Sequence, residues 1–167
     1  MKRKILQYPN DKLTIRSDIV AFPQVLSMTT RQLISDMIET LVTGGGIGLA
    51  APQLGEMVRI IIINTTTKPI ENSGIMEVMV NPVIEKKDGE VDSIEGCLSF
   101  KQYEERRYIV KRAKEIWVSY FDHNGEYHNN RHLKGIEAIC VQHEIDHLNG
   151  ITMNEAGVPM KKEEIKD

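Results

Sequence analysis

The amino-acid sequence predicts an α+β fold in which antiparallel or mixed β-sheets pack around a central helix, with a second helix toward the N-terminus. Two observations predict this class. Apolar residues recur with helical spacing after Arg31 and again after Gly135, and the chain between these segments reads as a series of strands. A chain of 167 residues with 41% hydrophobic composition can bury one core, so we expect residues 1–167 to form a single domain.

The first helix is predicted from the 3.6-residue period of the segment that begins at Arg31. The apolar residues of its inner face are Leu33, Ile34, Met37, Ile38, Leu41 and Val42. Thr29 and Gln32 have the spacing of a capping box in front of this face, and the glycines at 44–46 would end the helix behind it. We therefore expect an amphipathic helix between these two signals.

The middle of the chain predicts strands. Their segments are VRIIIIN (58–64), EVMVNPVIE (77–85), the stretch that leads into Cys97, and EIWVSYFD (115–122). The turn HNGE that follows predicts a hairpin toward the polar segment EYHNNRHL. A hairpin joins antiparallel strands, so the sheet is expected to be antiparallel or mixed.

After Gly135 the apolar period becomes helical again. One stripe of this second predicted helix carries Ile136, Ile139, Cys140, His143 and His147. Asn149 and Gly150 supply a natural end. This is the helix around which the sheets are expected to pack.

Charge and composition argue against several classes of partner. The net charge is -3, and no run of Lys and Arg alternates with aromatic residues, so a nucleic-acid partner is not expected. The apolar run at the N-terminus ends after Leu6, and eighteen apolar residues never run together, so neither a signal peptide nor a membrane span is expected. Cys97 and Cys140 are too few for a disulfide framework, which favours a reduced cytoplasmic protein.

The strongest chemical signal is QHEIDH (142–147) on the second predicted helix. Residues four apart lie about 40° from each other around an α-helix, so His143 and His147 can direct ring nitrogens at one metal ion. Glu144 would border that ion without binding it, which is the position of a general base. The alternative is a pair of core histidines, but on a buried stripe a metal bond would offset the cost of unpaired imidazoles.

A third ligand has to come from elsewhere in the chain. Beyond Gly150 only glutamates of a polar tail are available, whereas Cys97 in EGCLS (95–99) follows a predicted strand and carries a thiol suited to zinc or iron(II). A lone cysteine is otherwise a small buried hydrophobic residue. The remaining histidines, His123, His128 and His132, lie in a turn and a polar run and are expected to be surface or structural residues.

Three stretches taken together resemble peptide deformylases, which remove the formyl group from the N-terminal formyl-methionine of new polypeptides. They are GIGLAAPQ (46–53), EGCLS (95–99) and QHEIDH (142–147), in this order and spacing. The resemblance runs from about Tyr8 to Gly150 and implies a single catalytic domain. The long helix that many members carry after the metal-binding helix is not matched here. In this respect the chain resembles short members of the family, which are phage-encoded or otherwise divergent, and a phage-encoded member would act in the host cytoplasm.

The resemblance also assigns roles to residues. It makes Cys97, His143 and His147 the metal ligands, with water as the fourth, and makes Glu144 the acid and base. It implies that the side-chain amide of Gln53 and the backbone N–H of Leu98 hold the oxyanion formed on the formyl carbonyl. Without it, Gln53 would be read as an ordinary loop glutamine.

Substrate-binding residues follow in the same way. Ile47 and Gly48 lie in an extended segment that could pair with a peptide as an added strand. The resemblance places a methionine pocket against Ile136, Ile139 and Cys140, with Ile47 across from it, although plain core packing would explain Cys140 as well.

The charged stretch after EGCLS departs from the usual family pattern. We align its end so that Arg112 pairs with Glu95 behind the metal loop. Whether Arg106 or Arg107 faces the substrate backbone stays open.

The expected cofactor is one divalent metal ion. The resemblance implies iron(II), and zinc(II) or nickel(II) are alternatives in purified protein. The expected partners are N-formyl-methionyl peptides, as nascent chains at the ribosome, and the protein itself is expected to be a monomer. The competing hypotheses are a zinc peptidase with the same H-E-x-x-H motif and a metal-binding scaffold without turnover, but a structural zinc site would more often have four protein ligands.

Overall fold

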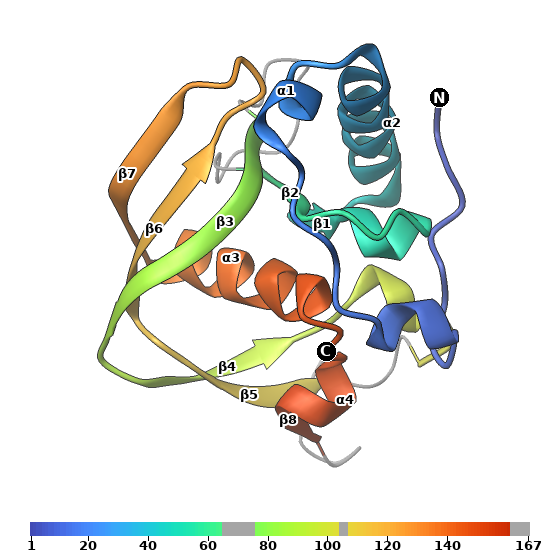
Figure 1. Ribbon diagram of the computed structural model, residues 1–167. Helices are drawn as coiled ribbons and strands as arrows, with labels where there is room; N and C mark the ends of the chain where they lie inside the picture. The colour runs from blue at the N-terminus through green and yellow to red at the C-terminus, as the bar shows by residue number, and fades with distance from the viewer. Residues whose placement is uncertain (65–75, 104–106, 161–167) are drawn as a thin grey trace.

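The computed structural model describes residues 1–64, 76–103 and 107–160, and it has the predicted α+β composition (Figure 1). The helices are η1 Asp11–Thr14, α1 Phe22–Val25, α2 Met28–Gly44, η2 Ala51–Leu54, η3 Leu98–Tyr103, α3 Gly135–Leu148 and α4 Met153–Ala156, where η marks a 3-10 helix. The strands are β1 Gly48–Ala50, β2 Ile60–Asn64, β3 Met76–Asp88, β4 Val91–Glu95, β5 Tyr108–Arg112, β6 Glu115–Phe121, β7 Tyr127–Lys134 and β8 Gly157–Pro159.

The strands form two antiparallel sheets. The first has the order β1-β2-β3-β6-β7 and the second the order β4-β5-β8. Figure 1 shows α3 running between them, with α2 on the far side of β1 and β2. The predicted arrangement, sheets around a central helix and a second helix nearer the N-terminus, is therefore confirmed.

Strand β2 explains why the first sheet has a helix on each face. Its four isoleucines, Ile60 to Ile63, are fully buried. Because successive side chains of a strand point to opposite faces, Ile61 and Ile63 join the core under α3, while Ile60 and Ile62 join the core under α2. Burying each isoleucine contributes roughly 1.5–3 kcal/mol, so both helices are fixed to the sheet through one short strand.

Helix α2 begins at a different cap from the predicted one. Ser27 is the N-cap, and its side chain accepts a hydrogen bond from the backbone N–H of Thr30. Thr29, the predicted cap, is exposed inside the first turn, so the capping-box prediction with Gln32 was wrong by two residues. The glycine stop is confirmed: Gly45 follows the helix with φ of 73°, a conformation that favours glycine.

Strands β5 and β8 were not predicted. Strand β5 lies in the stretch expected to be a charged loop, because charged residues hide its alternation: Tyr108, Val110 and Arg112 are buried, while Lys111 is exposed. Buried Arg112 is the unusual member, since a charged side chain is rarely found on an inner face without partners.

Across the described part of the chain, no helix is long and apolar enough to cross a membrane.

The cap of α2 gives a direct test of this local structure. Ser27→Ala removes the acceptor for the first free N–H groups of the helix and should lower the free energy of unfolding by about 1 kcal/mol. Thr29→Ala, at the cap expected from the sequence, should change the free energy of unfolding by only a few tenths of a kcal/mol. Urea unfolding of both variants at equal metal content checks this; a larger loss at Thr29 would contradict the observed cap.

Candidate active site

Helix α3 supplies the largest part of the site. It is buried on most of its circumference, because Ala138, Val141, Ile145 and Leu148 pack against the first sheet. The predicted stripe is not uniformly buried: Cys140 and His147 are buried, but Ile136 at the start of the helix is 53% exposed. Part of the stripe therefore lines a cleft, which Ile136, Ile139, Cys140 and His143 border, while His147 stays buried.

Three candidate ligands from two elements meet at this cleft. The ligand atoms of Cys97, His143 and His147 all lie within 4.8 Å of one another, and Cys97 Sγ is 3.2 Å from His147 Nε2. Cys97 stands between the end of β4 and the start of η3, so strand pairing in the second sheet brings it to the helix. One thiol and two imidazoles suit zinc(II) and iron(II), and three protein ligands leave a position open.

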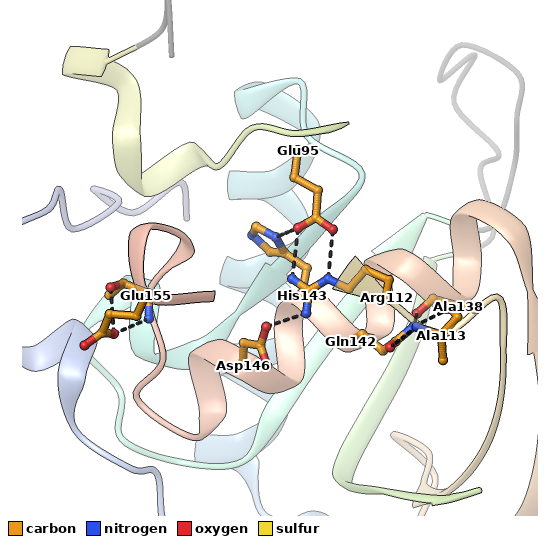
Figure 2. Close-up of polar contacts among 9 residues, drawn as sticks. Glu95, Arg112, Ala113, Ala138, Gln142, His143, Asp146 and Glu155 are labelled. Carbon is orange, nitrogen blue, oxygen red and sulfur yellow. Dashed lines mark hydrogen bonds and ion pairs between the residues drawn. The ribbon is translucent and has the colours of Figure 1, made fainter. Parts of the chain in front are cut away.

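The imidazole of His143 is oriented by a buried ion-pair network (Figure 2). Its Nδ1 lies 2.8 Å from the Glu95 carboxylate, which turns the other ring nitrogen away from Glu95. Arg112 donates two hydrogen bonds to Glu95, of 2.8 and 2.9 Å, and a third to Asp146 on the next turn of α3. The network thus joins β4, β5 and α3 directly behind the candidate metal ligands.

The electrostatics of the site favour an ionised cysteine. Burial alone would raise the pKa of the Cys97 thiol, but the charge of His147 and hydrogen bonds with both histidines hold this pKa well below its usual range. Burial likewise would raise the pKa of Glu95, and hydrogen bonds from Arg112 and His143 lower it to about 2. A thiolate is the form that binds metal, so the site is prepared for an ion by its own charges.

The carboxylate of Glu144 lies beside the three candidate ligands. It is 4% exposed, and its Oε2 has no hydrogen-bond partner within the described residues. Burial raises the pKa of Glu144 to about 7, although the charges of His143 and His147 act in the opposite direction. A buried polar atom without a partner is costly, so this oxygen is placed for a water or a substrate group.

Gln53 approaches the ligand cluster from η2, which follows β1 of the first sheet. Its side chain is buried; Oε1 accepts a hydrogen bond from the N–H of Ala50, and Nε2 donates to Ser99 Oγ at 3.0 Å. The same Nε2 lies 3.6 Å from Cys97 Sγ, at the edge of the ligand cluster. Leu98 lines the same cleft and opens η3, where the first backbone N–H groups have no acceptor within the helix.

A cleft of about 480 Å³ is lined by Cys97, His143, Glu144, Gln53 and Leu98, while His147 is buried beneath them and is not among its lining residues. Its walls include Ile47, Gly48, Ile136, Ile139 and Cys140, the residues predicted to bind substrate. Gly48 is required by packing: a Cβ at this position would lie 2.6 Å from Cys140 Sγ and would also collide with the Glu144 carboxylate. The backbone of β1 can therefore approach α3 this closely only with glycine at position 48.

The structure adds residues that sequence reasoning missed. Ser93 is buried in the wall of the cleft, and Lys101 lines it as well. Ser99 fixes the Gln53 amide, and Asp146 gives Arg112 its second acidic partner. For Ser93 the available signal was its alternation with Glu95 in β4, which places both on the inner face.

Arg107, one of the two arginines considered from the sequence, lines the cleft. Arg106, the other one considered, lies outside the described residues.

The other histidines lie away from this cleft. His132 stacks on Trp117 and contacts Glu115, and His128 stacks on Tyr120 and contacts Asp122. His128 also forms a loose group with Asp122 and Glu126. The Asp122 carboxylate in that group already accepts hydrogen bonds from the hairpin backbone, so these contacts stabilise the turn.

The fold and the site together define a metal-dependent hydrolase with an H-E-x-x-H helix. The family model for polypeptide deformylase matches residues 2–163 of this chain, and the chain belongs to that family. Members of the family remove the formyl group from nascent polypeptides, and they require a metal ion.

Relatives and solved structures agree. The chain is 36% identical to a peptide deformylase of Thermodesulfovibrio yellowstonii over 160 residues, covering 96% of this chain and 92% of the relative. It is 39% identical to a peptide deformylase of Neisseria meningitidis serogroup B over 163 residues, covering 97% and 90%. A crystal structure of a class I type b peptide deformylase from Acinetobacter baumannii with Met-Ala-Ser bound superimposes with a TM-score of 0.84 at 31% identity, covering 93% of this chain and 98% of that one.

Proposed function

We propose that this chain hydrolyses the formyl group of N-formyl-methionyl peptides in a single catalytic domain, with Cys97, His143 and His147 holding the metal ion and Glu144 as acid and base. The observation that carries the proposal is the unpartnered, buried oxygen of Glu144 beside these three donors, at the inner end of a cleft with apolar walls. A scaffold would gain nothing from such an oxygen, since burying it costs stability.

The donor set supports one divalent ion. Its thiol and imidazoles fit iron(II), which we propose as the native metal, and zinc(II) or nickel(II) as replacements in purified protein. When bound, such an ion polarises a carbonyl oxygen and lowers the pKa of a coordinated water. Metal analysis after anaerobic purification, compared with purification in air, tests the identity of the ion.

The chain's own residues supply the proton transfers and the oxyanion donors. Glu144 takes a proton from the attacking water and returns it to the leaving amine, so that the formyl C–N bond breaks into formate and a free amino terminus. Gln53 Nε2 and the N–H of Leu98 donate to the oxygen that becomes negative in between. The hydrogen bonds of Gln53 to Ala50 and Ser99 support this role, because they hold its amide in one orientation.

Substrate binding follows from β1 and α3. Strand β1 is an edge of its sheet, so one side of its backbone is available to pair with an extended peptide through hydrogen bonds that do not depend on sequence. The A. baumannii enzyme with bound Met-Ala-Ser supports a peptide ligand for this chain. We propose that Ile136, Ile139 and Cys140 receive the methionine side chain, that nascent chains at the ribosome are the substrates, and that the protein acts as a cytoplasmic monomer.

Removing the carboxylate tests the acid and base. Glu144→Ala should keep metal and fold but lose at least about 10²-fold in kcat on formyl-Met-Ala, because no other group replaces the proton transfer. Glu137→Ala, on the first turn of the same helix, is the control and should retain normal turnover. Acetyl-Met-Ala should remain uncut by the parent protein. Near-normal turnover of Glu144→Ala at full metal occupancy would remove Glu144 from the mechanism.

The third ligand is tested by metal content. Cys97→Ser replaces a readily ionised thiol by a hydroxyl that stays neutral, so both bound metal and deformylation should fall strongly. Cys140→Ser changes the other cysteine and should retain its metal. The measurement is the metal-to-protein ratio after dialysis; a fully metallated Cys97→Ser would mean that the third ligand lies elsewhere.

The methionine slot is tested by filling it. Ile139 precedes His143 by one helical turn, so Ile139→Trp should raise KM for formyl-Met peptides or abolish binding while metal content stays normal. The parent should prefer formyl-Met over formyl-Asp peptides by roughly ten- to two-hundredfold in kcat/KM. Ile139→Leu should keep that preference. Equal rates on both peptides, with Ile139→Trp unchanged, would show that methionine is recognised elsewhere.

A further inference from the structure

A second cavity adjoins the active-site cleft. It has a volume of about 380 Å³, and its walls carry the side chains of Lys2, Lys4 and Lys101. Gly44 and Lys101 line both cavities, so this space lies directly beside the cleft. Thr43 and Gln7 add polar groups, and among the residues that the structure describes, none that lines the second cavity is acidic.

The N-terminal segment is held so that its lysines face outward. Figure 1 shows it running extended beside α2. The amine of Met1 pairs with Asp36, the N–H of Arg3 donates to Thr40, and the Arg3 guanidinium pairs with Glu56. Between these tethers Lys2 and Lys4 are exposed while Arg3 is half-buried, which is the alternation of an extended chain.

The third lysine is fixed to the same segment. The backbone N–H of Lys101 donates to Gln7 Oε1 at 3.0 Å, and Gln7 Nε2 donates to the carbonyl of Leu98 at 3.0 Å. In the parts of the chain that the structure describes, Lys2, Lys4 and Lys101 make no ion pair. A concentration of positive charge in a chain with net charge -3 points to an anionic ligand.

The course of a bound peptide substrate suggests the source of such an anionic ligand. Gly48 lies against Glu144, and the segment from Gly48 back to Gly44 leads along the cleft toward Lys101. An extended peptide advances about 3.3 Å per residue, so a chain whose formyl group sits at Glu144 and that follows this segment would carry its later residues toward Gly44 and Lys101. We propose that Lys2, Lys4 and Lys101 form a subsite for acidic side chains at the third and fourth residues of the substrate, an inference that rests on the proposed function.

The expected effect is moderate and depends on salt. Single pairs of exposed charges contribute little, but three lysines around one cavity act together on the same side chain. We expect kcat/KM to favour an acidic over a neutral peptide by about three- to tenfold at low ionic strength. The preference should shrink toward one in 1 M salt, where the screening length is about 3 Å.

The test compares two isosteric peptides on the full-length, metal-loaded protein. Formyl-Met-Ala-Asp-Asp-Ala should be deformylated faster than formyl-Met-Ala-Asn-Asn-Ala, and the double variant Lys2→Glu/Lys4→Glu should abolish or reverse that order. Lys86→Glu/Lys87→Glu on β3 makes the same change of charge at residues that line neither cavity, and it should keep the preference. A preference that survives Lys2→Glu/Lys4→Glu, or equal rates on both peptides in the parent, would overturn the subsite.

Two further measurements separate this inference from the proposed function. Formyl-Met-Ala ends before the basic cavity, so all variants should process it at the parent's rate, and failure on it by the parent would count against the proposed function alone. Calorimetry with the unformylated peptides Met-Ala-Asp-Asp-Ala and Met-Ala-Asn-Asn-Ala needs no turnover. Tighter binding of the acidic peptide, lost in Lys2→Glu/Lys4→Glu, supports the subsite, and equal binding overturns it.

Discussion

The architecture of the site depends on one buried ion pair, between Arg112 and Glu95. A buried guanidinium is stable only when acidic partners satisfy it, and Arg112 has two, Glu95 on β4 and Asp146 on α3. These contacts hold the second sheet against the central helix. Because Glu95 also binds the ring of His143, the same interaction orients a candidate metal ligand and places the loop that carries Cys97.

The opposite wall of the cleft is set by close packing. Strand β2 is buried on both faces, which fixes its neighbour β1 at the edge of the first sheet, and Gly48 lets that edge lie directly against Glu144 and Cys140. An ion-pair network on one side and a glycine contact on the other leave a narrow space above α3. The reactive groups are therefore held by rigid elements, which is what positioned catalysis requires.

The same geometry joins sequence-independent and side-chain-dependent recognition. A strand edge can bind the backbone of any extended peptide, whereas the proposed slot at Ile139 would distinguish one side chain. At the far end of the cleft the anchored N-terminal segment brings Lys2 and Lys4 next to Lys101. In the proposed complex, the formyl-methionine end of the peptide would contact an apolar region near Glu144, and its later residues would contact an exposed, charged region near Gly44.

The sequence by itself determined the elements whose signals are local. The period of α2 and α3, the hairpin turn before β7 and the i, i+4 spacing of His143 and His147 depend only on neighbouring residues, and the three motifs identified the family. Sequence reasoning misplaced the cap of α2 by two residues, although that cap is a local contact between Ser27 and Thr30. It also missed β5 among charged residues and interpreted the stripe through Ile136 as buried, and both of these errors concern residues whose environment depends on distant segments. The pairing of Arg112 with Glu95, expected from the sequence, is present in the structure. Only the tertiary structure decided that Asp146 is the second partner of Arg112, that Ser93 lines the cleft, and that Lys2, Lys4 and Lys101 line one cavity. These positions follow from strand pairing and packing between segments far apart in the chain, which no local pattern encodes.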